Sequence, residues 1–186
     1  MDSHDMTNRR TQTGLGLRNF YLTRGIVAAA WVAAAFTVGK SAPLAASVLL
    51  VAYPAWDALA NLADAARSGG LARNRSQAIN ALVSGIAALA ILFALGDTKS
   101  VVALFGAWAI VAGLLQLVTG LRRWKTFGAQ WSMVLSGAQS ALAGGFFIKQ
   151  ALGGAVHGIT DVAPYAAFGA FYFLVSALWL TVRRGG

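Results

Sequence analysis

The carboxylate of Asp57 is the only charged group in a long apolar stretch, residues 42–63. A charged side chain at membrane depth costs about 2.5 to 3.5 kcal/mol, so it must face protein or water and either find a partner or take up a proton. Tyr53 and Asn61, one helical turn to either side, extend a polar stripe along the same face. Asp57 is therefore a candidate for a buried ion pair or for proton transfer.

The partners of Asp57 decide between these two roles. The second apolar stretch descends toward the same interface from which the third ascends, so matched depth predicts a contact with Asn80 or Ser84 inside the bundle. Arg24, one turn inside the first stretch, is the candidate cation, unless it extends to the lipid headgroups instead. With Arg24 in contact, Asp57 is structural; with only Asn and Ser donors, it becomes a candidate proton carrier.

Other polar side chains lie at a similar depth. In each predicted span they fall in the half that is nearer the cytoplasmic face, on which the N-terminus is expected to lie. They are predicted to form either a layer of interhelical hydrogen bonds, at about 1 kcal/mol or less each, or a cavity open to one side. With Asp57, the predicted layer comprises Asn61, Asn80, Ser84, Gln116, Gln139 and Ser140.

Familiar catalytic and cofactor motifs are missing from the sequence. It contains no Cys, and its two His residues, His4 and His157, are too far apart to suggest a zinc cluster. No Ser/His/Asp set, phosphate loop or recurring carboxylate pair is recognisable. We therefore expect no cofactor, no metal and no enzymatic activity. His157, with Asp161 four residues on, is either a sensor of external acid or simply solvated.

The composition places the chain in lipid. Hydrophobic residues make up 58% of the 186 residues and charged residues only 11%, too few to cover a soluble domain. The net charge of +9 would suit a nucleic-acid partner, but the basic residues form short clusters between apolar stretches and not one basic face. We expect the lipid bilayer as partner and no nucleic acid.

Six stretches are long enough to cross a bilayer as helices, which need about 20 apolar residues each. None alternates apolar and polar residues as a β-barrel strand does, so we predict an all-α bundle of six transmembrane helices in residues 20–183. Residues 1–19 form a polar cytoplasmic tail, expected to be poorly ordered. A signal peptide is the rival interpretation of the first stretch, but no convincing cleavage site follows Gly39. The predicted spans are residues 20–39, 42–63, 78–95, 101–121, 131–148 and 163–182.

The basic residues predict the orientation. With both termini in the cytoplasm, 12 of the 15 Lys and Arg residues fall inside, as the positive-inside rule expects for a bacterial inner-membrane protein. The three outside are Lys40, Lys99 and Lys149.

The six stretches also suggest three two-helix repeats, because the odd-numbered stretches share Arg24-Gly25, Ser84-Gly85 and Ser136-Gly137, each followed by a small residue. Repeats of two helices share one orientation, so the inverted repeat of many transporters is missing. Small-residue spacings such as Gly137, Ala141 and Gly145 permit close helix approach, either within this bundle or in a homo-oligomer.

Two segments carry a family resemblance: LFGAWAIVAGLLQLVTGLRRWK, from Leu104 to Lys125, and WSMVLSGAQSALAGGFFI, from Trp131 to Ile148. They resemble the HdeD-like family of small bacterial inner-membrane proteins, which are built from short two-helix membrane repeats. The resemblance implies a six-helix inner-membrane fold and a link to acid resistance, and supplies no catalytic residues.

Two functions follow as hypotheses. The first is a non-catalytic inner-membrane protein with a structural or acid-stress role. The second is a small transporter or proton-linked channel that uses Asp57, which the polar layer favours and the missing inverted repeat disfavours. An intramembrane enzyme ranks behind both, because no nucleophile and base are recognisable.

Overall fold

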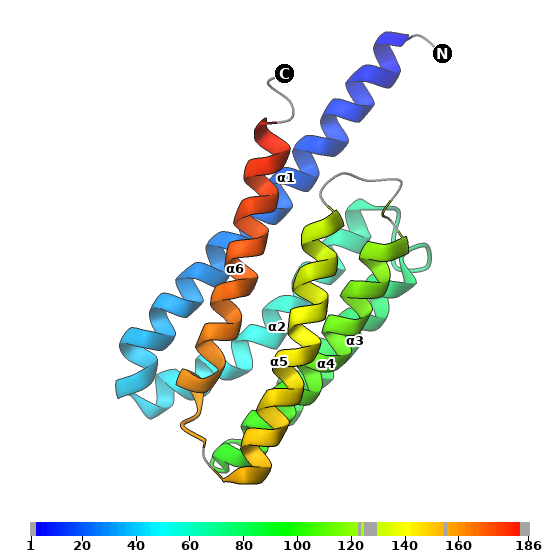
Figure 1. Ribbon diagram of the computed structural model, residues 1–186. Helices are drawn as coiled ribbons and strands as arrows, with labels where there is room; N and C mark the ends of the chain where they lie inside the picture. Colours follow the sequence, from blue (N-terminus) through cyan, green and yellow to red (C-terminus); the bar gives the residue numbers. More distant parts are fainter. Residues whose placement is uncertain (1–2, 123, 125–129, 155, 183–186) are drawn as a thin grey trace.

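The structure is a computed structural model. It describes the backbone of residues 3–122, 124, 130–154 and 156–182, and the side chains of these residues except 3–15, 17 and 132. All of the regular secondary structure in the described residues is helical, so the prediction of an all-α bundle is confirmed (Figure 1). The helices are α1 (Ser3–Ala34), continued by a π-helical turn η1 (Ala35–Gly39), α2 (Pro43–Arg67), α3 (Arg75–Ala94), α4 (Thr98–Arg122), α5 (Gln130–Gly153) and α6 (Ile159–Val182).

The helix α1 begins much earlier than the first predicted span. Residues 3–19 continue the helix out of the bundle (Figure 1), and the expectation of a poorly ordered tail stays a prediction. No proline interrupts this stretch. Once a helix has nucleated in the apolar span, each further residue whose backbone becomes fixed adds one hydrogen bond, so extension is easier than nucleation.

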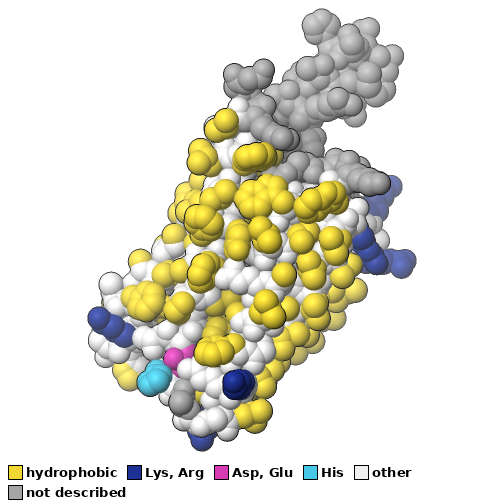
Figure 2. Space-filling view, viewed as in Figure 1, with side chains coloured by type: hydrophobic (Ala, Val, Ile, Leu, Met, Phe, Trp, Pro, Cys, Tyr) yellow, Lys and Arg dark blue, Asp and Glu magenta, His cyan; other side chains and the backbone are white. Residues whose placement is uncertain are grey.

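Five of the described helices, α1 to α4 and α6, are long and apolar enough to cross a membrane. The helix α5 is also long but does not belong to this group, so its role as a sixth span stays a prediction. Hydrophobic side chains cover the middle of the face seen in Figure 2, and basic side chains lie toward the two ends. The described chain is thus a multi-pass membrane protein.

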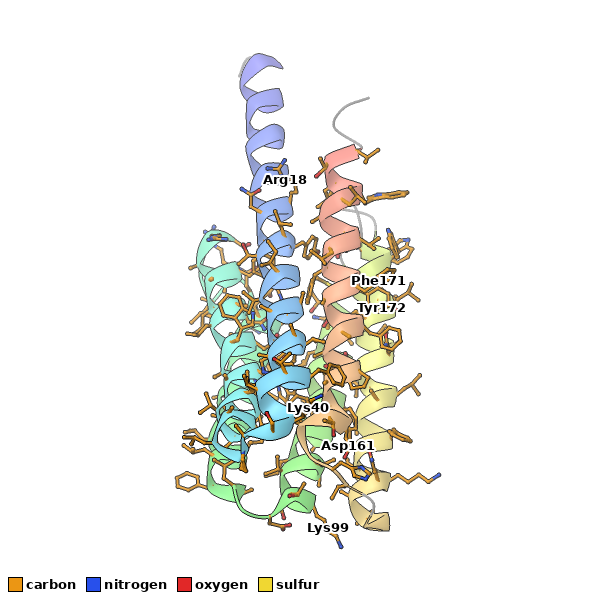
Figure 3. The ribbon with its side chains drawn as sticks, turned by 90° about the vertical axis from the view of Figure 1, so that its left-hand side faces the viewer. Arg18, Lys40, Lys99, Asp161, Phe171 and Tyr172 are labelled. Atoms are coloured by element: carbon orange, nitrogen blue, oxygen red, sulfur yellow. The ribbon has the colours of Figure 1, made fainter. Side chains whose placement is uncertain are left out.

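The helices form a ring in chain order, with α6 packed against α1. The most extensive contacts join α4 to α5, α1 to α6 and α2 to α3, and the least extensive contact between ring neighbours is the one between α1 and α2. The two ends of the chain lie at the same end of the ring (Figure 1). Lys40, Lys99 and Asp161 lie at the other end, opposite Arg18 (Figure 3).

Glycines make the close contact between α4 and α5 possible. A Cβ atom on Gly144 would lie 2.4 Å from the carbonyl oxygen of Gly106, and one on Gly137 would lie 2.7 Å from that of Gly113. Any larger side chain would therefore force these backbones apart. On the small-residue face predicted on α5, Gly137 packs closely against α4, whereas a Cβ atom on Gly145 would meet no atom within 4 Å.

Aromatic side chains fill the centre of the ring. The ring of Phe105 lies 5.0 Å from that of Trp108 and 6.2 Å from that of Tyr165, and the ring of Tyr53 lies 4.7 Å from that of Trp31. Edge-on arrangements predominate, as aromatic quadrupoles prefer. We call this group the aromatic cluster; its members are Trp31, Tyr53, Phe105, Trp108, Phe147 and Tyr165.

Candidate functional site

The centre of the candidate site is an ion pair between Arg24 on α1 and Asp57 on α2. The Nη2 atom of Arg24 donates a hydrogen bond to Oδ1 of Asp57. The two side chains are only 15% and 11% exposed, so both charges are largely removed from the surroundings of the protein. Of the two roles that the sequence left open for Asp57, this geometry favours the structural one, because the carboxylate already has a cation.

The second carboxylate oxygen of Asp57 has partners of its own. The Ser84 hydroxyl on α3 donates to Oδ2 at 2.9 Å, and the Asn61 amide donates to the same atom at 3.0 Å. The contact between Asp57 and Ser84 is the one expected from matched depth. The indole nitrogen of Trp108 on α4 then donates to the Ser84 oxygen at 2.9 Å. One network therefore joins α1, α2, α3 and α4.

The surroundings of Arg24 also favour a fixed cation. Its guanidinium carbon lies 4.6 Å from the ring centroid of Phe173 on α6 and 5.7 Å from that of Phe20. Cation–π contacts of this kind contribute about 0.5 to 2 kcal/mol. The side chain thus lies between α2 and α6 and does not extend to the headgroups.

Two small cavities adjoin the network on the side of the chain termini, and we call them the inner cavities. Each has a volume of about 50 Å³. Because a water molecule needs roughly 10 to 15 Å³ measured in this way, each has room for a few waters and not for an organic substrate. The two cavities share Arg24, Asn80, Gln116 and Phe173 in their walls.

Two polar atoms in these walls have no hydrogen-bond partner within the described part of the chain. They are Nε of Arg24 and Oδ1 of Asn80, and both are buried. Buried polar groups in native proteins are almost always satisfied, and a bridging water is the usual solution where a polar cavity has room. The inner cavities therefore suit ordered water.

The aromatic cluster closes the inner cavities toward the opposite end of the ring. Tyr53, Trp108 and Tyr165 line the deeper inner cavity. Beyond the cluster lies a separate outer cavity of about 390 Å³, which includes Lys40, Thr98 and His157 in its wall. The packed rings of the aromatic cluster thus lie between the inner cavities and the outer one.

The structure brings only part of the predicted polar layer together. Asp57, Asn61 and Ser84 share the network, and Asn80 and Gln116 face the inner cavities. Ser140 lines the deeper cavity and accepts a hydrogen bond from the Tyr165 hydroxyl at 3.2 Å. Gln139, half-buried on α5, belongs to neither inner cavity.

Three contributing side chains were missing from the predicted layer. Trp108 and Tyr165 bring an indole N–H and a hydroxyl from the aromatic cluster, and Gln77 donates to Asp64 at 3.1 Å near the cavity mouth. Buried Trp and Tyr usually find a partner for their polar atoms, which is the signal that could have identified the first two.

At the opposite end of the ring, two acidic groups fix the connections. Asp161 accepts a hydrogen bond from the backbone N–H of His157, and its other oxygen lies 3.2 Å from Nδ1 of the same residue. Asp97 precedes α4, and the hydrogen bond from the Ser100 hydroxyl is the main cause that lowers the pKa of Asp97. The described residues hold no group of three His, Cys, Asp or Glu side chains suited to a metal ion.

A family described as "Short repeat of unknown function (DUF308)" matches residues 77–149, which cover most of α3, all of α4 and most of α5. No curated protein and no solved structure matches the chain. The match supports a short repeat unit in this part of the chain and gives no activity for it.

Proposed function

We propose that this chain is a non-catalytic, multi-pass protein of the bacterial inner membrane, in which α5 is the sixth span. The observation that carries the proposal is the saturation of Asp57 by Arg24, Asn61 and Ser84. A carboxylate with a cation on one oxygen and two donors on the other needs no substrate to complete it. Its role is to hold four helices in register.

The distribution of cations supports an orientation with both termini in the cytoplasm. Arg67, Arg75 and Arg122 lie at helix ends on the side of the termini. Lys40 and Lys99 lie at the opposite end (Figure 3). Since short cytoplasmic loops carry the excess of Lys and Arg, the end with the termini is the cytoplasmic one.

We further propose a role in acid or stress resistance, as in the HdeD-like family. The resemblance of residues 104–125 and 131–148 supports it, together with the match to a short repeat. Deletion of the gene should lower survival after acid challenge, and the wild-type gene should restore it. Unchanged survival in the deletion strain would contradict the acid role.

A proton-linked channel or small transporter is the second candidate. The observation that favours it is the pair of inner cavities, which lead from the end with the termini to Arg24 and Asp57. Against it are the aromatic cluster, which closes the far side, and the positive charge already beside Asp57.

Proton and solute flux into liposomes distinguishes the two candidates. We expect the wild type and an Arg24→Met/Asp57→Asn double variant to show the same background flux. The double variant removes both charges together. The side-chain amide oxygen that Asp57→Asn introduces can still accept hydrogen bonds from Ser84 and Asn61. A flux specific to the wild type and lost in a folded double variant would establish the channel. Rescue of acid survival by the double variant would support the structural role.

A further inference from the structure

A lateral groove lies between α1 and α2, separate from the inner cavities. Its volume is about 240 Å³. The contact between α1 and α2 is the least extensive between ring neighbours, while α2 packs against η1, the continuation of α1, so the two helices separate with distance from η1. The groove is lined by Phe20, Thr23 and Arg24 of α1 and by Trp56, Leu59, Ala60, Ala63 and Arg67 of α2.

The walls of the groove are apolar along most of its length. On α2, Trp56, Ala60, Ala63 and Arg67 follow one another at helical spacing, so they share one face. At about 1.5 Å per residue, this face rises roughly 16 Å from Trp56 to Arg67. One leaflet of the hydrocarbon core is about 15 Å thick, half of the roughly 30 Å total. The groove therefore matches the length of one acyl chain.

The charge at the mouth of the groove belongs to Arg67. Arg24 also lines the groove, but Asp57 neutralises it. Arg67 is exposed in the last turn of α2, and within the described part of the chain no carboxylate lies at ion-pair distance from it. At the level of the headgroups, a free guanidinium suits a phosphate, which it can bind through two parallel hydrogen bonds.

We propose that this groove binds an anionic phospholipid, with one acyl chain between α1 and α2 and the phosphate at Arg67. The proposal requires only that these two helices lie in a bilayer, and in the proposed orientation the lipid belongs to the cytoplasmic leaflet. The length of the groove matches that of an acyl chain, its walls are apolar, and Arg67 at its mouth has no counter-ion among the described residues. All three features favour an anionic phospholipid as the occupant. A second copy of this chain, which has only six acidic residues, would have to bring one of them to Arg67 or leave Arg67 unused.

Quenching of tryptophan fluorescence by brominated phospholipids tests the proposal, because Trp56 lies in the wall of the groove. The full chain is placed in vesicles of zwitterionic lipid, and phosphatidylglycerol with brominated chains is titrated in. We expect a saturable component of quenching that disappears in Trp56→Phe. Brominated phosphatidylcholine with the same chains should give only the gradual quenching of random mixing.

Two pairs of variants separate a bound lipid from general surface attraction. Arg67→Gln should weaken the saturable component about five-fold, which corresponds to the roughly 1 kcal/mol of one basic residue at a membrane surface. The control Arg122→Gln removes the exposed arginine at the end of α4 and should leave the component unchanged. Ala63→Phe fills the groove and should abolish the component, whereas Ala66→Phe, at an exposed residue that does not line the groove, should not.

Several results would overturn the proposal. One is equal weakening by Arg67→Gln and Arg122→Gln, which would indicate attraction to the whole basic end. Another is saturable quenching that persists in Ala63→Phe, or a change of oligomeric state in that variant with no change in quenching, which would indicate a second copy as occupant. None of these results bears on acid survival or on liposome flux, so the proposed function stands or falls separately.

Discussion

Replacing Asp57 by Asn leaves the guanidinium of Arg24 buried without its counter-ion. The loss of one partner of a buried pair typically destabilises a protein by about 3 to 5 kcal/mol. We expect the lower end, about 3 kcal/mol, because Arg24 is 15% exposed and borders the inner cavities, and because its contact with Phe173 survives. The amide oxygen that Asp57→Asn introduces can still accept from Ser84 and Asn61.

The double variant Arg24→Met/Asp57→Asn should recover most of that loss. With both charges removed, no unpaired ion is left at this site, and replacement of a whole buried pair is often close to neutral. We expect the double variant to unfold within about 1 kcal/mol of the wild type, which gives a coupling free energy of about 2 kcal/mol or more between the two sites. Unfolding by dodecyl sulfate in mixed micelles, followed by circular dichroism, measures these differences.

Asp64→Asn is the matched control. Asp64 is on the same helix and accepts a hydrogen bond from Gln77, and no cation pairs with it within the described residues. The change should cost about 1 kcal/mol or less. The reasoning would be refuted if Asp57→Asn cost no more than Asp64→Asn, or if the double variant were as unstable as Asp57→Asn.

Three further predictions concern other parts of the molecule. Single cysteines introduced after Lys40, Lys99 and Gly154, in the three connections at the end opposite the termini, should all react with an impermeant reagent added outside the cell. A site that does not react from outside but does react in inverted membrane vesicles would refute the topology. Gly144→Ala should destabilise the bundle by about 1 to 3 kcal/mol, because its Cβ would meet a backbone oxygen at 2.4 Å, whereas Gly145→Ala, with nothing within 4 Å, should be neutral or slightly stabilising. The lowered pKa of Asp97 means that its support of the α4 start is present above its ordinary value of 3.8 and is lost as pH falls through the lower folded value. The protection of the Lys99 amide against hydrogen exchange, measured relative to its intrinsic rate at each pH, should therefore fall as pH drops through that value in the wild type and not in Asp97→Ala.

The sequence predicted the parts of the site that depend on depth alone. Distance along two antiparallel helices was enough to place Asp57 opposite Ser84, because helical rise is constant. The choice for Arg24 between an ion pair and the headgroups could not be made in this way, because the side chain is long enough for either. The contact of Trp108 with Ser84 could not be predicted either, since depth does not determine how α4 is rotated about its axis.

The order of packing around the ring was not evident from the sequence either. Shared sequence features suggested hairpins of consecutive helices, α1 with α2, α3 with α4 and α5 with α6. The most extensive contacts instead join helices of different hairpins, including the first helix to the last. Short connections determine which helices are neighbours, but the extent of contact depends on where small residues allow backbones to approach, as at Gly106 and Gly144.

The position of the ion pair in this ring has a physical reason. Arg24, Ser84 and Ser136 begin similar stretches of the odd-numbered helices, and all three lie at the network or at the deeper inner cavity. Only the first of them is charged, and its partner Asp57 is on α2, across the least extensive contact between ring neighbours. Where α4 and α5 meet, glycines bring backbones together and dispersion forces suffice. Where α1 and α2 separate, packing is sparse, and a charge-assisted hydrogen bond acts over a gap that short apolar side chains would leave open.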